Sequence, residues 1–350
     1  MSDSKNLIET PDFSGVPNLE QLILQRCTTL SRIHKSLWNL KRLIRLDLNG
    51  CKWLESLPDQ INMESLEVFI LSGCSRLKNF PKSVENMSHL SKLDLSETPI
   101  KHLPAFVKHL TVLINLDLSK CRNLSSLPDA ICHLTYLKSL NLSFCSKLDK
   151  LPESMGNIKG LEELNVSCTA IRELPSSIGR LEKLKVLTLI GCVGLSYSES
   201  LNKLLHTLSG LCSLTKLVLS YCNLSVIPDV IGCLSSLKVL DLGANNFVCI
   251  PESIIQLTNL EGLYLFDCTE LQSLPRLPLN IREVYLVGCI SLETIPIRPE
   301  YDFLTAVNLA NCFKITEEGY YDMISMMLRR DLIKVSLSLS LSLSLSFMKF

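Results

Sequence analysis

Leucines recur along this chain in a fixed arrangement with polar residues between them. Residues 137–161 read LKSLNLSFCSKLDKLPESMGNIKGL, which is the motif L-x-x-L-x-L-x-x-C-x-x-L-x-x-L-P followed by a short return segment. Leu140 and Leu142 alternate with Asn141, as in a strand with one buried face. The Leu-Pro step ends regular pairing, because proline lacks an N–H and restrains the preceding residue. One coil of this kind cannot bury its own leucines, so the pattern predicts stacked coils.

The motif returns about every 23 or 24 residues, which is the spacing of a leucine-rich repeat. The predicted repeats start at Leu19, Leu43, Leu66, Leu90, Leu113, Leu137, Leu161, Leu184, Leu214, Leu237, Leu260, Ile281 and Leu304. This series predicts an α/β fold: a right-handed leucine-rich repeat solenoid, curved like a horseshoe. A parallel sheet should line its concave side, with loops and short helices on the convex side.

The rhythm divides the chain into four parts. Residues 1–18 fit a partial first repeat, and residues 19–303 fit the solenoid. An insertion near 196–213 lengthens one repeat to 30 residues, and its leucines fall on one helical face. It is interpreted either as a longer convex helix packed on the solenoid or as a protrusion that binds a partner.

The C-terminal residues follow a different pattern. Residues 304–334 fit either a last repeat or the truncated opening of a C-terminal domain, and residues 335–350 form a low-complexity Ser-Leu tail. Because the chain begins inside a coil and lacks a polar cap ahead of it, we expect a larger protein truncated at both ends.

Cysteines are numerous, but the repeat accounts for most of them. Ten of the 15 occupy the ninth repeat position, namely Cys27, Cys51, Cys74, Cys121, Cys145, Cys192, Cys222, Cys268, Cys289 and Cys312. A thiol can fill this inward position as a compact apolar group with a weak S–H donor. The cysteines are therefore interpreted as part of the repeat architecture rather than as disulfides or metal ligands.

Overall charge and hydropathy give no support to several classes of partner. Lys+Arg and Asp+Glu number 35 each, so no net field favours nucleic acid or an anionic membrane surface. The N-terminus resembles no signal peptide, and no run reaches the ~18 apolar residues of a membrane span. The sequence predicts a cytoplasmic or nuclear protein without nucleic-acid or membrane partners.

Catalytic chemistry finds no support in the motifs. The chain has no phosphate-binding loop, no dinucleotide fingerprint, no HExxH and no kinase signature. We expect no enzyme, no cofactor, no metal and no catalytic residue. Asp94 and Asp117 should lie on adjacent coils roughly 5 Å apart, either as a pair with one raised pKa or as ordinary solvent-facing residues.

Outward positions become apolar and aromatic toward the C-terminus. The seven residues of this predicted aromatic surface are Thr188, Ile190, Val218, Tyr221, Tyr264, Phe266 and Tyr285. Large exposed aromatic side chains favour a protein-binding site. The alternative is packing against the chain's own insertion or C-terminal tail.

Two stretches carry a resemblance to a known family: NLIETPDFSGVPNLEQLILQRCTTL at 6–30 and VNLANCFKI at 307–315. With the LxLSxCxxLxxLPxSI rhythm between them, they resemble the leucine-rich repeat region of plant intracellular immune receptors. These are the nucleotide-binding (NLR) receptors with a toll/interleukin-1-receptor (TIR) domain. The resemblance covers nearly all of residues 2–315.

The resemblance implies a protein-protein interaction module in plant innate immunity. Its partners would be a pathogen effector, a guarded host protein, or the nucleotide-binding and TIR domains of a receptor whose switch it regulates. The signalling and nucleotide-binding domains do not occur in these residues, so nucleotide binding is not carried over. Two alternatives are a cytosolic scaffold of the Ras-binding repeat type, whose repeats mostly keep Asn where this chain has Cys, and a nonfunctional truncated product.

Overall fold

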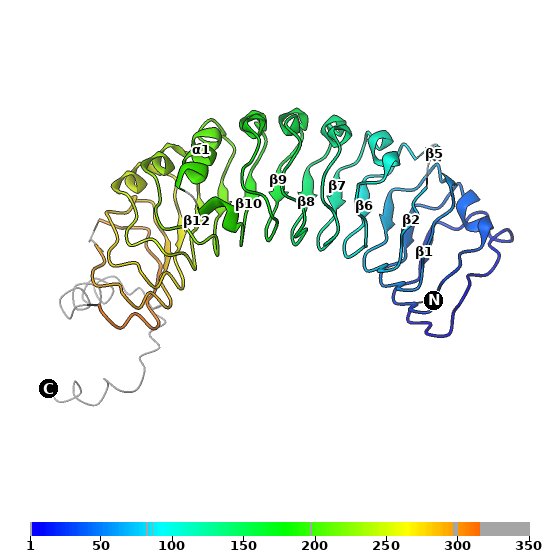
Figure 1. Ribbon diagram of the computed structural model, residues 1–350, viewed down its shortest axis with the longest axis horizontal. Helices are drawn as coiled ribbons and strands as arrows, with labels where there is room; N and C mark the ends of the chain where they lie inside the picture. Colours follow the sequence, from blue (N-terminus) through cyan, green and yellow to red (C-terminus); the bar gives the residue numbers. More distant parts are fainter. Residues whose placement is uncertain (1, 82, 86, 197, 297–299, 316–350) are drawn as a thin grey trace. The chain divides into compact units, whose positions relative to one another are not determined.

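Each leucine repeat forms one three-residue strand, followed by a loop and, in most coils, by a single turn of helix. The computed structural model describes residues 2–81, 83–85, 87–196, 198–296 and 300–315. They belong to two compact units, Met1–Leu184 and Lys185–Phe350. In each unit the strands stack side by side on one side and the helices lie on the other (Figure 1). This is the predicted leucine-rich repeat solenoid.

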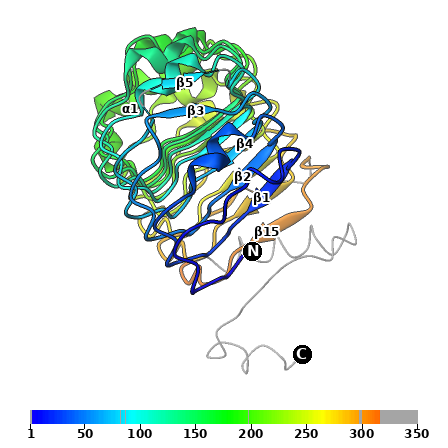
Figure 2. The same cartoon turned by 90° about the vertical axis from the view of Figure 1, so that its right-hand side faces the viewer.

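The first unit has seven strands in one parallel row (Figure 2). In order they are β1 (Gln21–Ile23), β2 (Arg45–Asp47), β4 (Val68–Ile70), β6 (Lys92–Asp94), β7 (Asn115–Asp117), β8 (Ser139–Asn141) and β9 (Glu163–Asn165). Two more strands, β3 (Gln60–Asn62) and β5 (Ser83–Glu85), pair with each other outside that row. They occupy the return segments of two coils whose neighbours form helical turns there.

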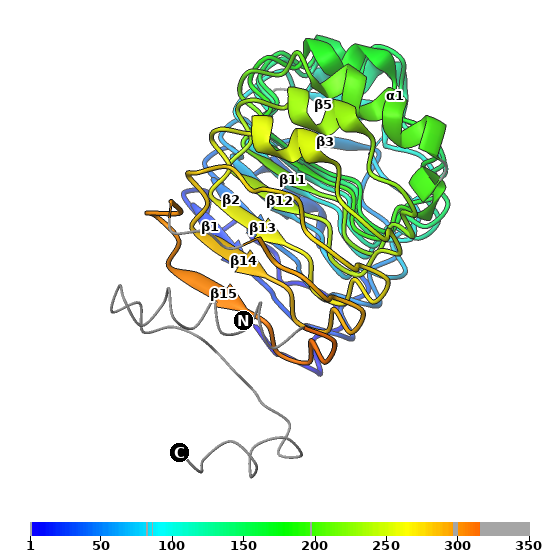
Figure 3. The ribbon, with the colours of Figure 1, turned by 90° about the vertical axis from the view of Figure 1, so that its left-hand side faces the viewer.

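The second unit continues the same plan with six parallel strands (Figure 3). They are β10 (Val186–Thr188), β11 (Lys216–Val218), β12 (Val239–Asp241), β13 (Gly262–Tyr264), β14 (Glu283–Tyr285) and β15 (Ala306–Asn308). All thirteen row strands begin two residues after a predicted repeat start. The register therefore aligns equivalent repeat positions in adjacent coils.

Helical turns on the opposite side close the coils. Those of the first unit are the 3₁₀ helices η1 (Lys35–Asn39), η2 (Ala105–His109), η3 (Asp129–His133), η4 (Met155–Asn157) and η5 (Ser176–Arg180). Those of the second are η6 (Val193–Ser196), η7 (Asp229–Cys233), η8 (Glu252–Gln256) and the α-helix α1 (Ser198–Leu208). Most follow a Leu-Pro or Ile-Pro step, whose extended proline ends the preceding segment and directs the chain into the turn.

The insertion supplies the single α-helix of the described residues. Its four leucines, Leu201, Leu204, Leu205 and Leu208, are buried, and the helix packs against η6 and η7. The polar residues between those leucines leave a solvated opposite face. The helix is therefore anchored on the helical side of its own unit.

Residues at the two ends of the described chain also pair with the coils. The backbone N–H of Asp3 donates to the carbonyl of Gln25 at 2.7 Å, and Glu9 bridges Arg32. At the other end, β15 pairs in register with β14, so residues 304–309 continue the repeat. Residues 316–350, which include the Ser-Leu tail, lie outside the described residues.

A row of thiol hydrogen bonds joins neighbouring coils through the core. The Sγ of Cys145, for example, donates to the carbonyl of Leu118 in the preceding coil at 3.1 Å. The same bond, at 3.0 to 3.3 Å, is made by Cys51, Cys74, Cys121, Cys222, Cys268, Cys289 and Cys312. The sequence predicted a compact inward group. The structure adds that the thiol gives a second hydrogen bond to a carbonyl beyond the strand, since the carbonyl of Leu118 also accepts the N–H of Cys121 at 3.2 Å.

One asparagine replaces cysteine in this row and makes more bonds than a thiol can. Asn245 is fully buried; its Nδ2 donates to the carbonyl of Leu219 at 3.0 Å, and also to two carbonyls of its own coil. Its Oδ1 accepts the N–H groups of Cys222 at 3.1 Å and Leu224 at 3.0 Å. Asn245 thus fixes the turn of the preceding coil from both sides.

We expect Asn245→Ala to lower the free energy of unfolding by about 3 kcal/mol, because two buried N–H groups lose their acceptor. Asn245→Cys should lose less, since a thiol can still donate to Leu219. Asn246→Ala is the matched control: this neighbour is exposed and should change stability by less than about 0.5 kcal/mol. Urea unfolding followed by circular dichroism measures all three. If Asn245→Ala lowered the free energy of unfolding no more than Asn246→Ala does, the buried hydrogen bonds of Asn245 would contribute nothing to stability.

The buried thiols should resist alkylation in the folded protein. Burial, with Cys121 close by, raises the pKa of Cys145 to about 12, and the thiolate is the reactive form. Cys212, Cys233 and Cys249 are exposed. Iodoacetamide at pH 8 should therefore label these three and leave Cys145 unmodified until denaturant is added, as read by peptide mass spectrometry. Rapid labelling of Cys145 in the folded protein would contradict the burial of its thiol in the core.

Candidate protein-binding surface

Aspartate and asparagine at the fifth repeat position cap the strands. The Oδ1 of Asp117 accepts the backbone N–H of Ser119 at 2.8 Å, and that of Asn141 accepts from Ser143 at 3.1 Å. Equivalent bonds are made by Asp47, Asp94, Asn165, Asp241 and Asn308. These side chains satisfy the donor that leaves the sheet two residues later. The recurrence of Asp or Asn at one spacing was the sequence signal for this role.

The predicted carboxylate pair is present in register, with Asp94 directly opposite Asp117. Burial is the main cause that raises the pKa of Asp94; Asp117 adds to it, and the hydrogen bonds from Ser96 oppose it. Asn141 donates to Asp117 at 3.2 Å. The pair is thus held in a network of strand caps, and its geometry has an ordinary structural explanation.

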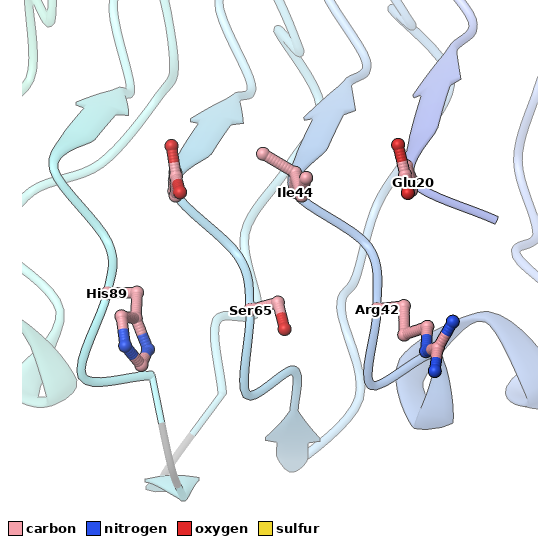
Figure 4. A pocket seen from close by; sticks show the side chains of 6 residues that line it. Glu20, Arg42, Ile44, Ser65 and His89 are labelled. Atoms are coloured by element: carbon pink, nitrogen blue, oxygen red, sulfur yellow. The ribbon is translucent and has the colours of Figure 1, made fainter. Parts of the chain in front are cut away.

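A shallow hollow of about 400 Å³ lies beside the strand starts of the first unit (Figure 4). Glu20 and Ile44 form one row of its lining, and Arg42, Ser65 and His89 form another. His89 is held away from the acids, because its Nδ1 bonds the carbonyl of Glu64 at 2.9 Å. The two rows do not converge on one point, so the hollow does not assemble an acid, a base and a nucleophile.

The aromatic surface lies on the strand side of the second unit. The register aligns Thr188 with Val218, Val218 with Asp241, Asp241 with Tyr264, and Tyr264 with Tyr285. Five side chains from five adjacent strands thus form one row. A carboxylate stands in the middle of that row, between a valine and two tyrosines.

The two tyrosines stack on each other. Their ring centroids lie 5.0 Å apart with planes 10° from parallel. Gly262 leaves room for the Tyr264 ring: a Cβ there would come within 3.0 Å of that ring. The Tyr264 hydroxyl donates to Oε2 of Glu283 at 2.9 Å. Stacking and this bond hold both rings in fixed positions along the sheet.

A second aromatic pair forms beside the first. Tyr221 and Phe266 have ring centroids 5.9 Å apart and tilted by 52°. The Phe266 ring fills the space over Gly243, where a Cβ would come within 2.4 Å of it. Tyr221 stands in the turn after its strand, with φ of 59° and 53% of its surface exposed. The sequence did not predict this pairing, because it joins residues two coils apart.

The other predicted members of the aromatic surface differ in exposure. Thr188, Ile190, Tyr264, Phe266 and Tyr285 are half-buried. The prediction that Val218 faces solvent is wrong: it is only 5% exposed. Val218 is a short side chain with register neighbours on both sides, at about the 4.8 Å spacing of strands, so those neighbours cover it.

Neither a metal site nor a membrane span is seen in the part of the chain that the structure describes. Within those ranges no group of three or more His, Cys, Asp or Glu side chains could hold a metal ion. No helix there is both long and apolar enough to cross a bilayer.

Comparison with known proteins agrees with the fold and adds the biological context. Residues 62–148 match the family of leucine-rich repeats from RPS4B-like disease resistance proteins. Residues 116–205 match a leucine-rich repeat region family, and 212–269 match a leucine rich repeat family. A leucine-rich repeat protein of Leptospira interrogans has the same fold, with a TM-score of 0.63, 20% identity and coverage of 95% of this chain and 94% of that one.

The chain is therefore a leucine-rich repeat protein. It is 40% identical over 299 residues to TMV resistance protein N of Nicotiana glutinosa, covering 84% of this chain and 26% of the relative. It is 36% identical over 235 residues to disease resistance-like protein DSC1 of Arabidopsis thaliana, covering 66% and 19%. The chain belongs to the family of leucine-rich repeat regions found in plant NLR disease resistance proteins. It spans about a quarter or less of the length of these two relatives.

Tyr264 should ionise later than an ordinary tyrosine. Burial first, and the Glu283 carboxylate second, raise its pKa to about 12. Glu283→Gln should lower that pKa but keep it above 10, since burial remains. Absorbance at 295 nm during alkaline titration, with Tyr264→Phe subtracted, measures it. Glu261→Gln is the control and should leave it unchanged. A late titration that persists in Tyr264→Phe would assign it to another tyrosine.

Proposed function

We propose that this chain is a protein-binding module of plant immunity that acts inside the cell. Its partner would be a pathogen effector, a guarded host protein, or the nucleotide-binding and TIR domains of a receptor that it regulates. The relatives support the immune context, because their names denote disease resistance. Leucine-rich repeat solenoids generally present extended surfaces for protein partners.

The aromatic surface is the observation that carries the proposal. The middle residue of most row strands is an inward leucine, and seven of the thirteen strands end in an Asp or Asn cap. The second unit, by contrast, presents four aromatic rings on its strand side. Tyrosine supplies large contact area at a low entropy cost and is enriched at binding hot spots. Stacking already restricts the motion of these rings, so binding would cost less conformational entropy.

The helical insertion does not account for these rings. Helix α1 packs on η6 and η7, on the side of the unit opposite the strands (Figure 3). We therefore propose the strand side, rather than the insertion, as the main docking face.

Tyr264→Ser combined with Tyr285→Ser should weaken binding of the partner at least tenfold. A library of secreted pathogen proteins and host proteins is screened with the purified chain, and the Kd of the tightest binder is then measured by calorimetry for each variant. The melting temperature should fall by less than about 4 °C, since both rings are half-buried.

Tyr136→Ser is the control for general surface tyrosines. Tyr136 is 66% exposed and lies in the first unit, outside the aromatic surface. Its loss should leave the Kd unchanged. An unaltered Kd in the double tyrosine variant would refute docking at this surface, and a large fall in melting temperature would show that the two rings serve the core.

A further inference from the structure

The strand side of the second unit carries carboxylates beside its aromatic rings. In the coils that start at Leu214, Leu237, Leu260 and Ile281, its outward positions hold three carboxylates and one ammonium group. These are Asp241, Asp267, Glu283 and Lys216. Glu261, at the edge of the same strands, is already paired with Lys238 at 3.1 Å and Arg282 at 3.5 Å. With Glu261, Lys238 and Arg282 included, the strand side of these coils carries four carboxylates and three cations beside the aromatic rings, an excess of one negative charge.

Two of the carboxylates stand on opposite sides of one ring. Asp241 is the register neighbour of Tyr264 on β12, and Glu283 accepts the Tyr264 hydroxyl from β14 on the other side. Tyr285 stacks on the Glu283 side, so the other neighbour of the Tyr264 ring in the row is the small Asp241. An aromatic face and a carboxylate are therefore next to each other.

Asp241 is positioned rather than free to turn away. Its Oδ1 accepts the N–H of Gly243 at 3.0 Å, and Lys216 is the nearby cation that favours its charge. Burial nevertheless raises its pKa. Because burial disfavours the charged form of Asp241, a cation supplied by a partner would stabilise the ionised carboxylate.

We propose that Asp241, Tyr264 and Glu283 form a site for an arginine side chain of a partner protein, a refinement that rests on the docking surface proposed above. A planar guanidinium can stack on the tyrosine ring and donate to a carboxylate at the same time. A lysine ammonium cannot match both contacts with one flat group. Complementary charge at such a site sets partner choice as well as affinity.

The substitution Asp241→Asn separates charge from structure. Asparagine already occupies the equivalent position in other coils, where Asn141 and Asn308 accept the same backbone N–H at 3.1 Å. The variant should therefore keep the strand cap and the fold while removing the charge. Asp117→Asn is the matched control, because Asp117 makes the same cap next to Asp94 and Asn141 rather than next to tyrosine.

Four capped peptides of sequence Gly-Ser-Leu-X-Leu-Ser-Gly serve as probes, with X as arginine, citrulline, lysine or glutamate. Binding to the whole chain is followed by ¹⁹F NMR of incorporated 3-fluorotyrosine, with signals assigned by Tyr264→Phe and Tyr285→Phe. The arginine peptide should shift both signals and bind at least tenfold more tightly than the citrulline peptide. Asp241→Asn should reduce that ratio to less than twofold, and Asp117→Asn should leave it intact.

Equal binding of arginine and citrulline peptides, or an unchanged ratio in Asp241→Asn, would overturn the arginine site. Equal binding of the lysine peptide would overturn the choice of guanidinium. The docking surface itself is judged separately: if the double tyrosine variant loses its protein partner while no peptide preference exists, the surface stands and the arginine site fails.

Discussion

The burial of two inward side chains per coil, mostly leucines, against the neighbouring coil is the constraint on which the rest of the structure depends. A three-residue strand with one loop has no interior of its own, so each coil is stable only between others. Leu140 in β8 and Leu142 directly after that strand illustrate this, because both have almost no exposed surface. Each coil packs against the coil before it and the coil after it. The same inward positions must therefore be filled by similar side chains in every coil.

The same constraint creates a hydrogen-bonding problem where the chain leaves the sheet. Carbonyls such as that of Leu118 turn inward and cannot reach a strand partner. The carbonyl of Leu118 accepts the N–H of Cys121 in its own turn, and the Cys145 thiol adds a bond from the next coil. Asn245 bonds the carbonyl of Leu219 with an amide that also accepts two N–H groups. On the outer side, Asp and Asn caps satisfy the donors. The buried thiols and the Asp and Asn caps thus each have a role in holding the fold together.

Side chains that neither the thiol row nor the cap row requires are free to vary, and in the second unit they include four aromatic rings. Gly243 and Gly262 allow the rings of Phe266 and Tyr264 to lie across the sheet. The rings then meet Tyr221 and Tyr285 in fixed geometry. Relatives that are plant disease resistance proteins make a protein partner the natural interpretation of such a surface. The stacked rings and the adjacent carboxylates hold that surface in a defined geometry.

The sequence by itself determined the solenoid, because its inward positions have one period and one residue type. All thirteen predicted repeat starts precede a strand by two residues, and Asp94 meets Asp117 as predicted. It also located the aromatic residues, since Tyr264 and Tyr285 occupy the same position of adjacent repeats.

Only the tertiary structure decided how outward side chains arrange themselves. The burial of Val218, the pairing of Tyr221 with Phe266 two coils away, and the bond between Tyr264 and Glu283 depend on ring directions and on the space left by glycines. Repeat spacing fixes which backbone positions are neighbours. Repeat spacing does not fix the direction of a side chain that lies outside the core. Contacts between coils determine that direction.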